Sequence, residues 1–125
     1  MNILLVDDSK TMRTIQKKML TNIPNAQFSE ASDGVEGLSV IAAAPTPFDL
    51  LIVDWNMPNM DGLTFVKKVR ETDKKSLIIM ATTEAEKSRV LDAVRAGVNN
   101  YVVKPFTGES LFEKVSQTIA KAKAA

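Results

Sequence analysis

The chain has 125 residues, with 16 basic and 15 acidic side chains and neither cysteine nor histidine. We expect a single domain over residues 1–125, because this length supports one sizeable core and no second domain. The formal net charge of +1 excludes bulk attraction to nucleic acid or to a membrane surface. Ser-His and Cys-His catalysis are excluded, as are thiolate and imidazole metal sites, so oxygen ligands for a hard cation remain.

The sequence also lacks a membrane-targeting segment. No apolar stretch approaches the roughly 18 residues that a bilayer-spanning helix needs, and no signal peptide precedes the first apolar run. We therefore expect a cytoplasmic protein with no membrane insertion.

Five short runs along the chain have the composition of β-strands, namely 3–6, 27–30, 49–53, 76–81 and 100–103. Four of them are apolar on both faces, which is typical of buried parallel strands. The run 27–30 is the least apolar and is predicted to lie at an edge of the sheet.

Segments with apolar residues at helical spacing follow these strands. Their stripes are Met12, Ile15 and Met19; Val35, Leu38 and Ile41; Val66 and Val69; and Leu111, Val115, Ile119 and Ala122. We expect each stripe to pack against the core. A further helix is predicted within 85–98, where Val90 and Val94 lie four residues apart. Strict alternation of strand and helix predicts an α/β fold, with a parallel sheet covered by helices on both faces.

Four of the strands end at residues that can handle a phosphoryl group, which are Asp7 and Asp8, Asp54, Thr82 and Thr83, and Lys104. The carboxyl ends of parallel strands share one rim of an α/β sheet, where ligands bind. Carboxylates, a hydroxyl and an ammonium are therefore expected to meet at this rim. Such a set suits a divalent cation and a phosphoryl group.

Adjacent acids such as Asp7 and Asp8 repel each other and call for a compensating cation. Together with Asp54 they could hold a partly hydrated Mg²⁺. For the pair alone, a helix cap by Asp8 or Ser9 is an equally good explanation.

Asp54 is the candidate nucleophile, because a carboxylate beside a metal can attack a phosphoryl donor and form an acyl phosphate. Lys104 would supply a further cation, and Pro105 after it ends the strand sharply. Thr82 could bond one phosphoryl oxygen. The alternatives are a solvated strand end for Lys104 and an ordinary β residue for Thr82.

With these residues in place, the chain resembles bacterial response-regulator receiver domains, and among them the single-domain chemotaxis regulators. The resemblance rests on the segments ILLVDDS at 3–9, DWNMPNMDG at 54–62, MATTE at 80–84 and AGVNNYVVKPF at 96–106. It covers essentially the whole chain. It implies a flavodoxin-like, doubly wound (βα)5 fold with strand order 2-1-3-4-5 and no output domain.

The resemblance also implies roles for individual residues. Asp54 would be the phosphoacceptor for a histidine kinase of the chemotaxis type, and Thr82 and Lys104 would contact the phosphoryl oxygens. Asp8 and Asp54 would bind Mg²⁺ directly, Asp7 would act through a metal-bound water, and the backbone carbonyl of Asn56 would complete the metal site.

By the same resemblance the protein would be a monomeric signalling protein rather than an enzyme. It would phosphorylate itself from donors and lose the phosphate slowly, with or without a phosphatase. Its target would be the flagellar motor switch. The target face would comprise Ala85, Lys87, Val90, Val94, Tyr101, Val103 and Lys114. Thr83 departs from the small residue usual in the family and is expected to narrow access to Asp54.

Other functions use similar residues. A haloacid-dehalogenase-type phosphatase needs a second Asp two residues after its nucleophile, but Asn56 stands there and cannot act as a general acid or base. A flavin-binding module would need a phosphate-cradling loop where Asp7 and Asp8 lie. A phosphate sink or a regulator outside chemotaxis remain alternatives to motor output.

Overall fold

The computed structural model describes residues 1–83 and 87–124 and contains a parallel sheet of five strands in the order β2-β1-β3-β4-β5. The strands are β1 (Asn2–Val6), β2 (Gln27–Ala31), β3 (Leu50–Asp54), β4 (Leu77–Thr82) and β5 (Asn100–Val103). The helices are α1 (Lys10–Met19), α2 (Gly34–Ala43), α3 (Gly62–Arg70), α4 (Val90–Ala96) and α5 (Gly108–Ala124), with a short 3-10 helix η1 (Lys87–Arg89) before α4. The predicted α/β class and strand order are confirmed, and β2 is an edge strand as expected.

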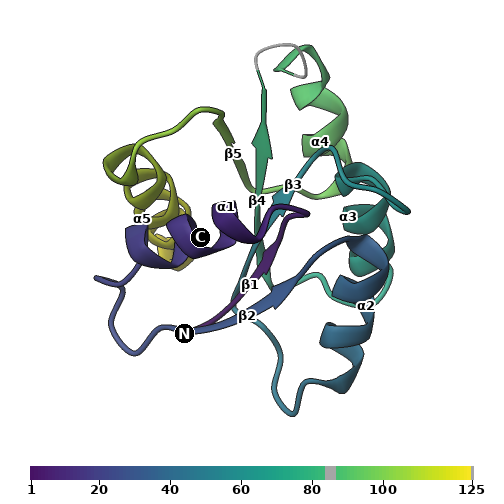
Figure 1. The fold of residues 1–125 in the computed structure, drawn as a ribbon, viewed down its shortest axis with the longest axis horizontal. Coiled ribbons are helices and arrows are strands. Elements are labelled where there is room, and N and C mark those ends of the chain that lie inside the picture. Colours follow the sequence, from purple (N-terminus) through teal and green to yellow (C-terminus); the bar gives the residue numbers. More distant parts are fainter. Residues whose placement is uncertain (84–86, 125) are drawn as a thin grey trace.

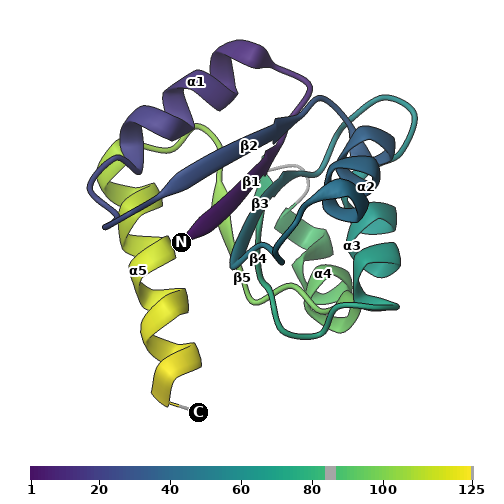
Figure 2. The same cartoon turned by 90° about the horizontal axis from the view of Figure 1, so that it is seen from below.

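Helices cover both faces of the sheet. Helices α1 and α5 lie on one face, and α2, α3 and α4 lie on the other (Figures 1 and 2). Alternate residues of β1 serve the two sides: Leu4 and Val6 belong to the apolar cluster beneath α2 to α4, whereas Ile3 and Leu5 belong to the cluster beneath α1 and α5. Burial on both faces explains why the central strands are apolar throughout.

Two of the predicted helix stripes are partly wrong. Ile15 of α1 is 38% exposed, and Val35 of α2 is 50% exposed. In α1 the buried position is Gln16, which lies one helical turn before the buried Leu20. Because positions four apart share a helix face, the face that carries Gln16 and Leu20 points toward the core. Ile15 lies outside this face and is therefore exposed.

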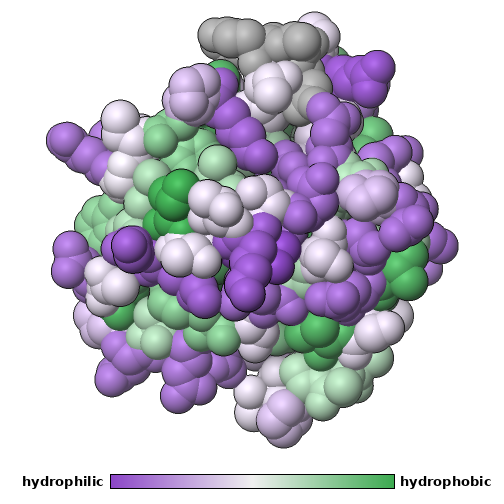
Figure 3. All heavy atoms as spheres, viewed as in Figure 1, coloured by the Kyte–Doolittle hydropathy of each residue, from purple (hydrophilic) through white to green (hydrophobic). Residues whose placement is uncertain are grey.

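The face of the molecule seen in Figure 3 is largely polar. Figure 3 shows hydrophilic side chains over much of one face, with separate apolar patches between them. Across residues 1–83 and 87–124, no helix combines the length and the apolar character needed to cross a bilayer.

The connection from β3 to α3 folds back tightly on the end of β3. The Gly62 amide donates to the Trp55 carbonyl oxygen at 2.8 Å, and Asn59 adopts a left-handed backbone with φ of 68°. The Asn59 side-chain amide donates to the Asp33 carboxylate at 2.8 Å and so ties this loop to the start of α2. A Cβ atom added to Gly62 would lie 2.3 Å from the backbone oxygen of Asp54. The first turn of α3 therefore presses directly on the peptide of Asp54.

Gly62→Ala should destabilise the protein, because the new methyl group meets backbone that cannot move away. We expect a loss of about 1 to 3 kcal/mol in the free energy of unfolding, as for other overpacked sites. Gly108→Ala is the matched control at the start of another helix, where the new Cβ would lie 3.3 Å from the flexible side chain of Met19. Urea unfolding of both variants measures the difference, and equal stabilities would contradict the tight approach at Gly62.

Candidate functional site

The carboxyl ends of β1, β3, β4 and β5 form one rim, as the sequence predicted. Asp54 pairs in register with Ala81, so Thr82 lies one position beyond it on the neighbouring strand. Thr82 pairs with Val103, and the Lys104 amide donates to the Thr82 carbonyl oxygen at 2.6 Å. The register of the sheet thus places Asp54, Thr82 and Lys104 on three adjacent strands.

Lys104 joins two acidic strand ends. Its ammonium donates to Asp54 Oδ1 at 3.0 Å and to Asp7 Oδ2 at 3.3 Å. Its side chain is only 20% exposed, so it is not the solvated strand end considered as an alternative. The Lys104–Pro105 peptide bond is cis.

Every polar group of Asp7 has a partner. Its amide donates to the Ala31 carbonyl oxygen at 3.1 Å, and its carbonyl oxygen accepts from the guanidinium of Arg13. Its Oδ1 accepts from the Ser9 amide at 2.8 Å, and its Oδ2 accepts from Lys104. Asp7 is 1% exposed. Because both carboxylate oxygens are engaged, Asp7 is less available than its neighbour for direct metal binding.

Asp8 is exposed and is not needed to begin a helix. Ser9 is the N-cap of α1, and its hydroxyl accepts from the Met12 amide at 3.1 Å. Of the two capping candidates, the structure therefore assigns Ser9. The carboxylate of Asp8 stays at the rim beside Asp7 and Asp54.

Burial dominates the electrostatics of Asp54. It raises the pKa of this carboxyl to about 6, against the lowering effect of the Lys104 ammonium, and the Asp7 and Asp8 carboxylates add to the rise. Partial burial lowers the pKa of Lys104, but its Asp54 and Asp7 partners outweigh this and raise it. The lysine therefore stays charged, while the carboxylate it faces is costly to ionise.

The three acids could hold a metal ion. Asp7, Asp8 and Asp54 each offer a carboxylate oxygen, and these oxygens lie within 4.8 Å of one another. When all three acids are ionised, the Lys104 ammonium leaves two negative charges unbalanced, which one divalent cation would balance. An all-oxygen set with an exposed side suits a hard cation that keeps some of its waters. Asn56 lies exposed two residues after Asp54, in the connection to α3.

Two threonines at the end of β4, Thr82 in the strand and Thr83 directly after it, differ in exposure. Thr82 is 1% exposed, and its hydroxyl donates to the carbonyl oxygen of Thr83 at 3.3 Å. Thr83, where the chain departs from the family pattern, is exposed at the rim.

Several residues of the predicted target face lie on α4, β5 and α5. The Lys114 ammonium of α5 lies over the Tyr101 ring of β5, 5.3 Å from its centroid. On α4, Val94 is 54% exposed and Val90 is half-buried. Val103 is half-buried in β5, Ala85 lies outside the described residues, and the side chain of Lys87 is likewise not described.

Sequence reasoning missed one exposed apolar residue on α4. Leu91 is 58% exposed and adjoins Val90, whereas the helix turns Ala93 inward. A helical wheel centred on Val90 and Val94 could have found it, because positions 90, 91 and 94 share one side of a helix.

Comparisons with known proteins bear on what this rim does. The sequence matches the family model of the response regulator receiver domain over residues 3–116. A chemotaxis protein CheY homolog of Campylobacter jejuni is 47% identical over 121 residues, which cover 95% of this chain and 92% of the homolog. Chemotaxis protein CheY1 of Helicobacter pylori is 50% identical over 118 residues, which cover 92% of this chain and 94% of that protein. The solved structure of the chemotaxis response regulator CheY4 of Vibrio cholerae has a TM-score of 0.84 and 34% identity, and the match covers 94% of this chain and 97% of that one.

The chain therefore belongs to the response regulator receiver domain family, whose members are the signalling components of two-component systems. The curated relatives described above are CheY-type chemotaxis proteins. The family and the flavodoxin-like fold predicted from the sequence are confirmed. The match decides against the haloacid-dehalogenase-type phosphatase and the flavin-binding module.

The raised pKa of Asp54 makes the stability of the protein depend on pH. The folded carboxyl keeps its proton up to about pH 6, whereas the ordinary value is 3.8, so the free energy of unfolding falls as the pH rises through this interval. Asp54→Asn carries no charge at any pH. In EDTA at pH 7.5 we expect it to be more stable than wild type, because it avoids the cost of ionising a buried carboxyl. The gain should be about 1 to 2 kcal/mol, which is less than the full pKa shift implies, since solvent screens part of the charge.

Urea unfolding followed by circular dichroism measures this difference. The gap should narrow as the pH is lowered from about 7.5 to about 4, because the folded wild type is then protonated at Asp54. A variant that is less stable than wild type at pH 7.5 would show that ionising this carboxyl costs the fold nothing.

Proposed function

We propose that this chain is a chemotaxis-type response regulator that accepts a phosphoryl group on Asp54 from a histidine kinase and then binds the flagellar motor switch. The observation that carries the proposal is the position of Asp54 at the end of β3, 3.0 Å from the Lys104 ammonium and beside the acid pair that ends β1. The relatives named as chemotaxis proteins support a role in chemotaxis over a regulator of another pathway.

In the transfer step, an oxygen of the Asp54 carboxylate attacks the phosphorus of phosphohistidine. The P–N bond breaks, its electron pair stays with the imidazole nitrogen, and the product is an acyl phosphate on Asp54. Lys104 lies where it can follow the new phosphoryl charge, and Thr82 lies on the adjacent strand where its hydroxyl can bond a phosphoryl oxygen. With a pKa of about 6, the Asp54 carboxyl is mostly ionised at neutral pH and can therefore act as the nucleophile.

Asp8 and Asp54 would hold Mg²⁺ directly, with Asp7 acting through a bound water and the backbone carbonyl of Asn56 completing the set. The ion, when bound, would neutralise negative charge on the acids and on the incoming phosphoryl group. Engagement of both Asp7 oxygens by Ser9 and Lys104 supports its indirect role.

The target face would respond to the charge on Asp54. Movement of Thr82 and Lys104 toward the phosphoryl oxygens acts on the ends of β4 and β5, and β5 carries Tyr101. The exposed apolar residues of α4 and the ammonium of Lys114 suit an acidic amphipathic peptide of the switch protein. The regulator would act in the cytoplasm as a monomer, and lose its phosphate by slow autodephosphorylation or through a phosphatase.

Phosphorylation is tested directly with a small phosphodonor such as acetyl phosphate. Intact-mass spectrometry should show one phosphoryl adduct on the wild type in the presence of Mg²⁺. No adduct should form on the wild type in EDTA, or on Asp54→Asn under either condition. Asp49→Asn is a control at the opposite end of β3, where the amide oxygen can still accept from the Asn2 amide. An adduct of unchanged yield in Asp54→Asn would place the phosphoacceptor elsewhere.

The target face is tested with two valines of similar exposure. Val94→Asp on α4 should weaken binding of a switch-derived peptide to the phosphorylated protein by about tenfold or more, because it places a charge in an apolar contact. Val35→Asp on α2 is the matched control, since Val35 is 50% exposed and Val94 is 54% exposed. Fluorescence anisotropy of a labelled peptide gives the affinities, and equal losses in both variants would contradict a site on α4.

A further inference from the structure

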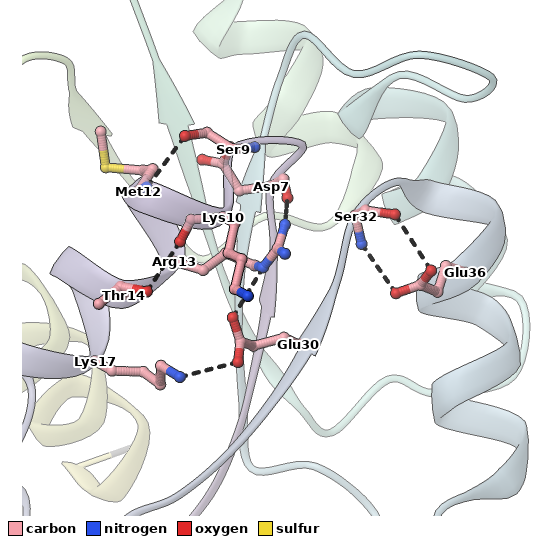
Figure 4. A network of polar contacts seen from close by, with 10 residues as sticks. All are labelled: Asp7, Ser9, Lys10, Met12, Arg13, Thr14, Lys17, Glu30, Ser32 and Glu36. Atoms are coloured by element: carbon pink, nitrogen blue, oxygen red, sulfur yellow. Dashed lines mark hydrogen bonds and ion pairs between the residues drawn. The ribbon is translucent and has the colours of Figure 1, made fainter.

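Arg13 connects three segments around the acidic rim. Its Nε donates to Glu30 Oε1 at 2.9 Å, and its Nη1 donates to the backbone carbonyl oxygen of Asp7. Lys17 donates to the other oxygen of the same Glu30 carboxylate at 2.9 Å. In Figure 4 the guanidinium lies between Glu30 of β2 and the backbone at the end of β1. The Arg13 side chain is 12% exposed, so its position is set by these contacts.

The carbonyl that Arg13 holds belongs to the peptide group between Asp7 and Asp8. Because a peptide group is planar, the orientation of this carbonyl also fixes the Asp8 amide and the position of the Asp8 Cα atom, which carries the side chain. On the other side of Asp7, the amide is fixed by Ala31, and the following turn is fixed by Ser9 at the start of α1. Arg13 supplies the remaining restraint on this peptide.

We propose that Arg13, oriented by Glu30, is a positioning residue that fixes the Asp7–Asp8 peptide and thereby raises the affinity of the rim for a divalent cation. This inference rests on the proposed metal site. A charge-assisted hydrogen bond to a neutral carbonyl is stronger than a neutral one and restricts the orientation of the peptide. Residues that orient metal ligands without touching the metal commonly change metal affinity by about 10-fold to 100-fold when removed.

Charge repulsion alone predicts the opposite change in Mg²⁺ affinity when Arg13 is removed. Arg13 is a cation close to a site that would bind a cation, so its removal should tighten binding if charge repulsion were its main effect. Glu30 offsets much of this repulsion, because its carboxylate pairs with both Arg13 and Lys17. The pairing with Lys17 and Arg13 also lowers the pKa of Glu30, which keeps it ionised. The direction of the change in Mg²⁺ affinity therefore separates positioning from repulsion.

The test measures the Mg²⁺ dissociation constant by calorimetry and by the fluorescence of Trp55, the only tryptophan and the neighbour of Asp54. Arg13→Ala should bind Mg²⁺ about tenfold more weakly than wild type. Arg13→Lys should be intermediate, because an ammonium lacks the fixed fork that reaches two acceptors. Lys17→Ala is the matched control, since it removes a cation from the same Glu30 without touching Asp7, and it should stay within about twofold of wild type.

A merely structural role for Arg13 would lower the stability in EDTA but leave the Mg²⁺ affinity of the folded protein unchanged. Under the proposal, the phosphorylation rate from a small donor should recover in Arg13→Ala as Mg²⁺ approaches saturation, because only the metal concentration required has increased. Unchanged or tighter Mg²⁺ binding by folded Arg13→Ala would overturn the inference.

A measurement on the wild type covers the case in which Arg13→Ala does not fold. The side-chain ¹⁵Nε signal of Arg13 should shift when Mg²⁺ binds, whereas that of Arg70, which is bonded to the Gly97 carbonyl oxygen, should not. An unshifted Arg13 signal at saturation would overturn the proposal. If Asp8→Ala and Asp54→Asn bind Mg²⁺ as tightly as wild type, the metal site itself is wrong. If those two lose binding and Arg13→Ala does not, only the positioning role fails.

Discussion

The ammonium of Lys104 between the carboxylates of Asp7 and Asp54 is the interaction on which the rim depends. The two acids are 1% and 8% exposed, and without a cation such a pair could not both remain ionised. Lys104 reaches them because its own amide extends the pairing of β5 with β4. The sheet register thus delivers the cation, and the same register puts Thr82 beside the acid it would help to phosphorylate. Under the proposed function, a change of charge at Asp54 would act first on the ends of β4 and β5.

Asp54 lies at the edge of the core, where its backbone is buried but its side chain reaches the rim of the sheet. Val53 and Trp55 on either side of Asp54 are almost fully buried, so the backbone around Asp54 is held by apolar packing. The Asp54 side chain itself ends at the rim, where part of its charge reaches solvent. Its raised pKa reflects mainly the cost of burial, which the Lys104 ammonium offsets in part and the Asp7 and Asp8 carboxylates increase. The stability of the α/β core offsets this cost, and a bound cation would reduce it.

The strands and their polar ends could be predicted from the sequence because strands buried on both faces are apolar throughout and the rim residues follow each of them directly. The helices were predicted less well. A stripe of Met12, Ile15 and Met19 looks inward on the sequence, yet the sheet meets the line of Gln16 and Leu20. The contact of Arg13 with Asp7 could not be predicted either. It depends on how α1 lies across the end of β1 and on Glu30 from a separate strand, and neither leaves a periodic signal in the sequence.

The short edge strand β5 is the element best placed to join the rim to the proposed target face. It has four residues and pairs only with β4, so fewer hydrogen bonds hold it than hold the central strands. Lys104 follows it directly, and Tyr101 within it lies beneath the ammonium of Lys114 on α5. A pull on Lys104 therefore acts on a strand that can shift without breaking pairing on a second side. The opposite edge, β2, is tied to α1 through Glu30, Arg13 and Lys17. Under the proposed function, this difference would direct the response to phosphorylation toward the β5 side of the sheet.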